Sequence, residues 1–401
     1  MYEMATDTAA ARQRPAGADR GRVLAALTAC HTINDFYGLF LPPLLPALRE
    51  AFNLSYSQAG MIPFVSTGLS ALLQPTLGYL ADLRGIRRHL MVCGFVVLAI
   101  GALGVGLAGS YPALLLAAAL LGVGASTYHP QSATLLTYHF PRGSRGRAQG
   151  VHGIGNGLGF IAAPLAVAFL AERLGWQLAA AALAAPALLA ALVVLAVLRE
   201  PPIRSSRGLL AGLTRRLLLL TVVNGLGLAA STGFITWLPS YYTAQGHSLL
   251  ASGALTAAIS IAALLAQPLG GGLSDWLGRR NVIAASLVSA SACLALFVGA
   301  PGVVYTVPLS LLVGFSTSLL PPVTMVYASE LASGERTGMS VGVVWGMGIA
   351  ISSLTPLVTG SVIDTHGFAT AYLILAVTAG IAALLALLLP GRADHLERDG
   401  R

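Results

Sequence analysis

His31 and Asp35 lie four residues apart in an otherwise apolar stretch, HTINDFYGLFLPP (31–43). On a helix this spacing places both side chains on the same face. Histidine changes charge near neutral pH; a neighbouring carboxylate favours its charged form, whereas burial opposes it. The pair therefore predicts a site where a proton is shared and can change place. The alternative is a neutral, hydrogen-bonded pair that only packs one helix against another.

Two further apolar stretches carry polar groups, GASTYHPQSATLL (124–136) and GVHGIGNGLGFIAAPL (150–165). In the first, Pro130 frees a backbone carbonyl, and His129 and Gln131 flank the interruption, where a broken helix can present such groups to a bound molecule. The second contains His152 and five closely spaced glycines. No strand precedes these glycines, so they predict close helix packing or a bend rather than a nucleotide-binding loop.

The composition predicts the elements that position these groups. Hydrophobic residues make up 56% of the 401 residues and charged residues 9%, whereas about 25% of a soluble domain is charged. This balance is typical of a multi-pass membrane protein, in which a central carboxylate costs at least about 2.5 kcal/mol. Asp35 is the only acid that we place well inside an apolar segment, and its cost indicates a function.

Twelve segments are long and apolar enough to span a bilayer. The predicted spans are 23–48, 57–82, 89–108, 112–137, 147–171, 176–198, 216–243, 250–275, 281–299, 303–328, 337–363 and 368–389. All 23 basic residues are arginines; with the N-terminus inside, 21 lie on the cytoplasmic side and only Arg49 and Arg173 outside. This asymmetry predicts cytoplasmic N- and C-termini. It also explains the basic pI without a nucleic-acid partner.

The predicted fold is all-α, with two pseudo-symmetric bundles of six helices. We expect a cytoplasmic tail at 1–22, bundles at 23–198 and 216–389, a linker at 199–215 and a second tail at 390–401. The three cysteines show no CxxC spacing, so we expect no disulfide or metal site, and no cofactor. Residues 74–88 align with 267–280 at an offset of 193, and Gly146, Gly150 and Pro164 align with Gly338, Gly342 and Pro356 at an offset of 192. Such a parallel repeat predicts a cavity between the halves.

With its twelve spans, 6+6 repeat and paired loop signature, the chain resembles the major facilitator superfamily. The loop signature reads Gly78, Leu80, Asp82, Gly85, Arg87 and Arg88 in the first copy, and Gly271, Leu273, Asp275, Gly278, Arg279 and Arg280 in the second. The resemblance implies a cytoplasmic gate, with Asp82 facing the start of span eleven near Arg336–Gly338 and Asp275 facing the start of span five near Arg145–Gly150. The alternative is that both aspartates only assist membrane insertion.

Motifs in spans one, two, four and five resemble the fosmidomycin-resistance branch of exporters. They comprise His31, Asn34, Asp35, Gln74, Pro75, His129, Pro130, Ser132, Gly155, Asn156 and Gly157. Gln131 stands where that branch has a glutamate, which shifts the expected proton coupling to Asp35, His31, His129 and His152. Family geometry then implies a substrate cavity lined by Tyr128, Gln131, Asn156, Asn224, Trp237, Ser316, Thr324, Tyr327 and Trp345.

The sequence thus predicts a proton-coupled secondary transporter of the inner (plasma) membrane that works as a monomer by alternating access. The leading interpretation is export of a small organic molecule, such as a drug or metabolite, in exchange for a proton. Uptake of a small metabolite or weak organic acid with a proton is the alternative, and a non-transporting sensor or scaffold ranks below both. A membrane enzyme is not expected, because the sequence has no Ser/His/Asp cluster, HExxH motif or phosphate-binding loop.

Overall fold

The computed structural model describes residues 17–200, 214–300, 302–331 and 337–391, and every regular element within these ranges is a helix. The first half of the chain forms α2 (Gly17–Gly38), η1 (Pro42–Leu44), α3 (Leu45–Phe52), α4 (Tyr56–Arg84), α5 (Arg87–Gly106), α6 (Tyr111–Ala125), α7 (Tyr128–His139), α8 (Arg142–Ala182) and α9 (Ala185–Val197). The second half forms α10 (Arg215–Ala244), α11 (Leu249–Leu277), α12 (Arg279–Val298), α13 (Val303–Ser318), α14 (Leu320–Leu331), α15 (Thr337–Ser353) and α16 (Thr355–Ala386). The all-helical fold class is confirmed.

Eight helical runs among the described residues are long and apolar enough to cross a membrane. Two of them, Gly143–Val197 with 55 residues and Val341–Ala386 with 46, are about twice as long as one crossing needs. Each contains a break, at Gly175 (φ 80°) and Gly367 (φ 78°). The polar helix α2 is not among the eight runs, nor is α4, so the number of twelve spans stays a prediction.

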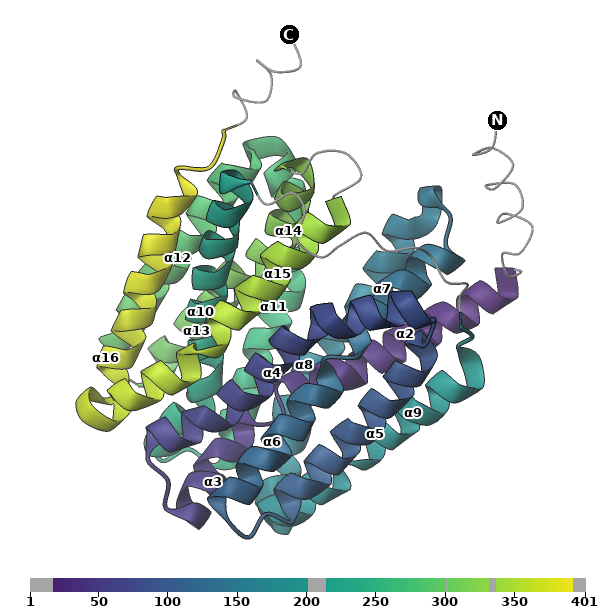
Figure 1. The fold of residues 1–401 in the computed structure, drawn as a ribbon. Helices are drawn as coiled ribbons and strands as arrows, with labels where there is room; N and C mark the ends of the chain where they lie inside the picture. Colours follow the sequence, from purple (N-terminus) through teal and green to yellow (C-terminus); the bar gives the residue numbers. More distant parts are fainter. Residues whose placement is uncertain (1–16, 201–213, 301, 332–336, 392–401) are drawn as a thin grey trace, which may run out of the picture.

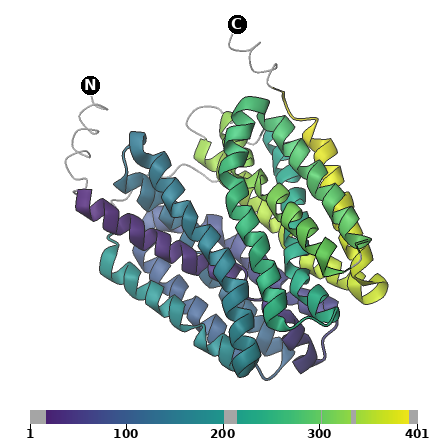
Figure 2. The same cartoon turned by 180° about the vertical axis from the view of Figure 1, so that it is seen from behind.

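The helices before residue 201 and those after residue 213 form two bundles that lie side by side (Figure 1). Between the bundles, α4 packs against α15 and α16, and α8 packs against α11. The bundles diverge toward the end that carries both termini and meet at the opposite end, as the reverse view also shows (Figure 2). We call the first the terminal end and the second the closed end.

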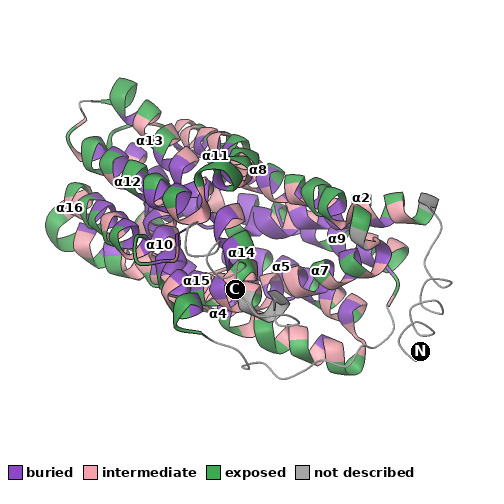
Figure 3. Cartoon of the chain, turned by 90° about the horizontal axis from the view of Figure 1, so that it is seen from above, coloured by how far each residue is buried: buried purple, intermediate pink, exposed green. Residues whose placement is uncertain are grey.

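The buried apolar residues form two cores, one of which crosses between the bundles. The larger apolar core runs from the first bundle into α10 and α16, where it includes Phe234, Trp237 and Tyr372, whereas a smaller core around Leu217 and Tyr327 belongs to the second bundle alone. Exposed leucines lie on the outer faces, and buried residues gather where helices face one another (Figure 3). An apolar exterior of this extent is typical of a surface that contacts lipid.

Some predicted segments fall largely outside the described residues. These are most of the predicted linker (201–213), most of both predicted tails (1–16 and 392–401) and Arg336. The predicted bundle boundaries at 23–198 and 216–389 stay predictions.

Candidate functional site

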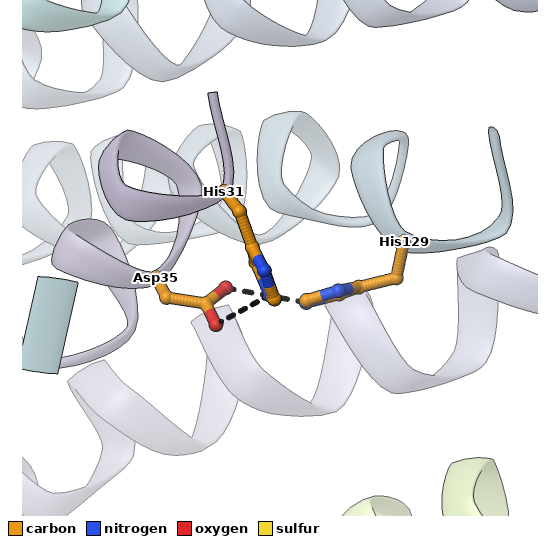
Figure 4. A group of neighbouring side chains, drawn as sticks. All are labelled: His31, Asp35 and His129. Atoms are coloured by element: carbon orange, nitrogen blue, oxygen red, sulfur yellow. Dashed lines mark ion pairs between the residues drawn. The ribbon is translucent and has the colours of Figure 1, made fainter. Parts of the chain in front are cut away.

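The carboxylate of Asp35 is the centre of a buried polar cluster formed by α2, α7 and α8. Its side chain is 5% exposed, and Nε2 of His31 lies 3.1 Å from Oδ2 while Nε2 of His129 lies 3.3 Å from Oδ1. Figure 4 shows the two imidazoles converging on the carboxylate from different helices. Amide groups complete the shell: Nδ2 of Asn34 donates to Oδ1 (2.9 Å) and Nδ2 of Asn156 donates to Oδ2 (2.5 Å).

Close packing of α8 against α2 makes this shell possible. A Cβ at Gly155 would lie 2.5 Å from the backbone oxygen of Thr28 and 2.9 Å from Cβ of His31. Any larger residue would therefore push α8 away from α2. The short separation allows Nδ1 of His31 to reach the backbone oxygen of His152 at 2.8 Å.

The contacts of His31 constrain where hydrogens lie on its two ring nitrogens. A carbonyl oxygen can only accept, so Nδ1 of His31 carries a hydrogen. If Nε2 carried none, its lone pair would face an ionised carboxylate at 3.1 Å, which is repulsive. One proton therefore lies between Nε2 of His31 and Oδ2 of Asp35, either as an imidazolium beside a carboxylate or as an imidazole beside a carboxylic acid.

His152 stacks on His31, with ring centroids 4.1 Å apart. The hydroxyl of Tyr128 donates to the backbone oxygen of Leu27, so its oxygen accepts from Nε2 of His152 at 3.0 Å. This leaves Nδ1 of the neutral His152 ring without a hydrogen-bond partner. A second positive charge on the stacked ring would be repelled by a charged His31. The stacked pair of rings therefore favours no more than one positive charge.

Three groups of the cluster also have the chemistry of metal ligands. The ligand atoms of His31, Asp35 and His129 all lie within 4.8 Å of one another. The two histidine–aspartate separations, 3.1 and 3.3 Å, are equally those of hydrogen bonds, so the three groups satisfy one another without an ion.

Comparison with known proteins identifies the family. The sequence pattern of the Major Facilitator Superfamily matches residues 24–307 and 217–400. The chain belongs to this superfamily. It is 30% identical to the fosmidomycin resistance protein of Escherichia coli over 396 residues, which cover 94% of each chain. It is 26% identical to the uncharacterised superfamily transporter YfnC of Bacillus subtilis over 390 residues, which cover 92% of each chain.

Solved structures agree on the fold. A bacterial homologue of the human lysosomal transporter Spinster, in an inward-facing and occupied conformation, superimposes with a TM-score of 0.83 at 19% identity. The match covers 94% of this chain and 97% of that one. The resemblance to the major facilitator superfamily drawn from the sequence motifs is therefore confirmed.

In the second bundle, the residues at the repeat positions of His31, His152 and Asp35 can be compared with the cluster. Asn224, at the repeat position of His31, donates from Nδ2 to the backbone oxygen of Val344 (3.2 Å), which is the repeat position of His152. Oγ1 of Thr324 donates to Oδ1 of Asn224 (3.1 Å). Leu228 takes the place of Asp35. The repeat thus preserves the contact between helices but not the charge.

The other predicted cavity residues occupy varied surroundings. Trp237 is fully buried and donates from Nε1 to Oγ1 of Thr359 (2.8 Å), and the hydroxyl of Tyr327 donates to the backbone oxygen of Pro390 (2.6 Å). Ser316 pairs with Ser289 (2.8 Å). Gln131 is buried, while Asn156 and Trp345 are partly exposed. Of the predicted cavity residues, Asn156 contacts Asp35 itself, and Tyr128 contacts the rings of His31 and His152 beside it.

The paired loop signatures form ion-pair clusters at the terminal end. In the first copy, the guanidinium of Arg87 is 2.6 Å from Asp82, and Glu200 accepts from the backbone N–H groups of Arg87 and Arg88 (2.8 Å each). In the second copy, Arg279 bridges Asp275 (2.5 Å) and Glu330 (2.9 Å). Gly85 and Gly278 have φ values of 62° and 88° where the helices end.

Further contacts involve other residues of the predicted cytoplasmic gate. Arg88 donates to the backbone oxygen of Leu195 (2.5 Å), Gly78 lies against Pro130, and a Cβ at Gly271 would meet nothing within 4 Å. Arg280 lies beside Gly391. The side chains around Arg336–Gly338, the predicted partner of Asp82, lie outside the described residues. Sequence reasoning missed Glu200, because 113 positions separate it from Arg87 and no local pattern links them.

Proposed function

We propose that this protein is a proton-coupled transporter that exports a small organic molecule in exchange for an inward-moving proton. Asp35 and His31 carry the proton, and His129 passes it to and from the accessible side of the cluster. The observation that carries the proposal is the 3.1 Å separation between Nε2 of His31 and Oδ2 of Asp35, two nearly buried groups that can share one proton.

The surroundings of Asp35 support a titrating role rather than a packing role. Four donors face its two oxygens, so the ionised form is solvated by the protein itself. A protonated Asp35 needs an acceptor for its own hydrogen, and Nε2 of His31 or His129 supplies one. Both protonation states are therefore accommodated by the same set of contacts, which is what repeated loading and release require.

The graded exposure of the cluster supports a path for the proton. The side chain of His129 is 36% exposed, while that of Asp35 is 5% exposed. His129 comes from α7, directly before Pro130, whereas Asp35 comes from α2. A rocking motion that separates α2 from α7 would separate His129 from the carboxylate and change which side can exchange protons with it.

The charge of the cluster restricts the cargo. One carboxylate and one shared proton favour a neutral or cationic molecule over a multiply charged anion, which would need basic partners. In the described spans the guanidinium groups lie at helix ends, away from this cluster. We therefore propose a neutral or cationic amphiphile as cargo, exported across the inner membrane by a protein that works as a monomer.

The experiment uses proteoliposomes that contain a trapped pH dye. Candidate amphiphiles added on one side should drive proton movement with the parent protein, and Asp35→Asn should abolish it while leaving the protein folded. Glu50→Gln, at an exposed acid of α3, is the matched control and should keep full flux. Full cargo-driven flux in Asp35→Asn would refute the role of Asp35.

The direction of the proton current tests the export mechanism. Protons that move against the cargo support exchange, whereas protons that accompany the cargo support uptake. Cargo movement without any proton current in the parent protein would refute coupling altogether.

A further inference from the structure

Two acidic residues outside the proton cluster stand at equivalent places of the repeat. Glu172 and Asp364 are separated by the repeat offset of 192, and each lies three residues before a glycine with positive φ, Gly175 or Gly367. Both glycines end the straight part of a long helix, α8 or α16. The repeat thus places one carboxylate of each bundle at the same level of the closed end.

Each carboxylate reaches across to the other bundle. Oδ1 and Oδ2 of Asp364 accept from the backbone N–H groups of Tyr56 (2.7 Å) and Ser57 (2.8 Å), the first residues of α4. Oε2 of Glu172 accepts from the backbone N–H of Leu250 (2.7 Å), the second residue of α11. Ser57 and Leu250 are themselves repeat equivalents at an offset of 193.

The carboxylates supply hydrogen-bond acceptors for the first N–H groups of α4 and α11. A helix leaves its first N–H groups without partners inside the helix. Oγ of Ser55 accepts from the third residue of α4 (3.1 Å), and Oγ of Ser248 accepts from the third residue of α11 (3.2 Å). The serine caps therefore leave the first two N–H groups of each helix to other acceptors. An anion at that place also gains from the partial positive charge of the helix start.

About one turn after each of these helix starts, the bundles touch through backbone. A Cβ at Gly60 of α4 would lie 2.2 Å from the backbone oxygen of Pro356, and one at Gly253 of α11 would lie 2.4 Å from that of Pro164. These four residues are again two repeat-equivalent pairs. The helix starts can receive the carboxylates because α4 and α11 approach the opposite bundle this closely.

We propose that Glu172 and Asp364 form a pair of contacts between the bundles, here called catches, that hold the closed end shut. Each holds the first turn of a helix in the opposite bundle, and both release when that end opens. The two catches resist opening on both flanks, at α8–α11 and at α4–α16. The inference rests on the alternating access of the proposed function, but not on proton coupling or on the identity of the cargo.

The test measures the distance across the closed end with two spin labels. Labels at Leu107, in the first bundle, and Gln245, in the second, are both exposed and take no part in the catches. In a background without Cys30, Cys93 and Cys293, Asp364→Ala and Glu172→Ala should each raise the ratio of long to short distances about two- to fivefold. The double variant should combine both effects, and Glu50→Ala should leave the distribution unchanged.

The isosteric pair Asp364→Asn and Glu172→Gln keeps the test decisive if the alanine variants unfold. These amides retain an accepting oxygen but lose the charge, so they should produce a smaller shift in the same direction. An unchanged distribution in the double variant, or an equal shift in Glu50→Ala, would overturn the proposal. Because this measurement needs neither cargo nor proton flux, its failure would leave the role of Asp35 standing.

Discussion

The two bundles share a backbone plan but differ at one buried place. In the first bundle His31 contacts the backbone oxygen of His152, and in the second Asn224 contacts that of Val344. Beside them stand Asp35 in one bundle and Leu228 in the other. The shared contact joins two helices, so it serves packing in both bundles. The carboxylate and the imidazoles, which the second bundle lacks, are the groups to which we assign the proposed proton coupling.

The difference also shows how the protein accommodates a charge in an apolar interior. Asn224 is fully buried and satisfied by neutral partners, the backbone oxygen of Val344 and the hydroxyl of Thr324. Asp35 is instead surrounded by four nitrogen atoms, two of amides and two of imidazoles, from three helices. A buried ionised group without such partners is strongly destabilising. The first bundle thus needs more polar partners to hold a charge at Asp35 than the second needs to hold the neutral Asn224.

The largest effect is expected when the first bundle is given the residues of the second. The double variant His31→Asn/Asp35→Leu removes the carboxylate and the imidazole that share the proton and leaves His129 and His152 without an acidic partner, while a helix contact like that of Asn224 can still form. Cargo-driven proton flux should fall to that of empty vesicles, measured with the trapped pH dye. Leu228→Met, at the corresponding place in the second bundle, is the control and should keep its flux.

The second largest effect, on stability, is expected at Gly60 and Gly253, where both bundles make the same close backbone contact. Gly60→Ala and Gly253→Ala each force a Cβ against a proline carbonyl of the other bundle. Overpacking of this kind costs about 1–3 kcal/mol, so both variants should lower the midpoint of thermal unfolding. Gly272→Ala, where a Cβ meets nothing within 4 Å, is the matched control. Equal midpoints for all three variants would contradict the close approach.

Much of this comparison was predictable from the sequence. The hydropathy pattern, the repeat and the paired loop signatures led to the all-helical class and the superfamily, because each is a local or periodic property. The i, i+4 spacing of His31 and Asp35 placed them on one face, and the structure has them 3.1 Å apart. The same face of α2 brings Asn34 to the carboxylate.

What the sequence could not provide are partners brought together only by packing between helices. Asn156 reaches Asp35 across 121 positions, and Glu172 reaches Leu250 across 78. Trp237, a predicted cavity residue, likewise has its ring against Tyr56 and donates from Nε1 to Thr359, two partners that its position on α10 does not reveal. Rotation of a nearly uniformly apolar helix has no clear signal in its residue pattern.

A third prediction separates packing from coupling. Asn224→Ala leaves the hydroxyl of Thr324 and the carbonyl of Val344 without this buried partner, which costs about 1–3 kcal/mol. The midpoint of thermal unfolding should fall, while each protein that remains folded should still show cargo-driven proton flux. Loss of flux without loss of stability in Asn224→Ala would place ion handling in both bundles and break the comparison. Asn224→Gln, which keeps the amide, should recover part of the stability.

The smallest expected difference lies between the two copies of the loop signature. Arg87 is 1% exposed and binds Asp82 and Glu200, whereas the side chain of Arg279 is 18% exposed and binds Asp275, which is 71% exposed, and Glu330. Lysine keeps the charge but cannot reproduce the planar contacts of a guanidinium. Because exposed ion pairs contribute about 0–1 kcal/mol, Arg279→Lys should change the unfolding midpoint little. Arg87→Lys should lower it clearly, because a buried charge without its full set of partners is costly. Equal midpoints in the two variants would mean that the copies contribute alike despite their unequal burial.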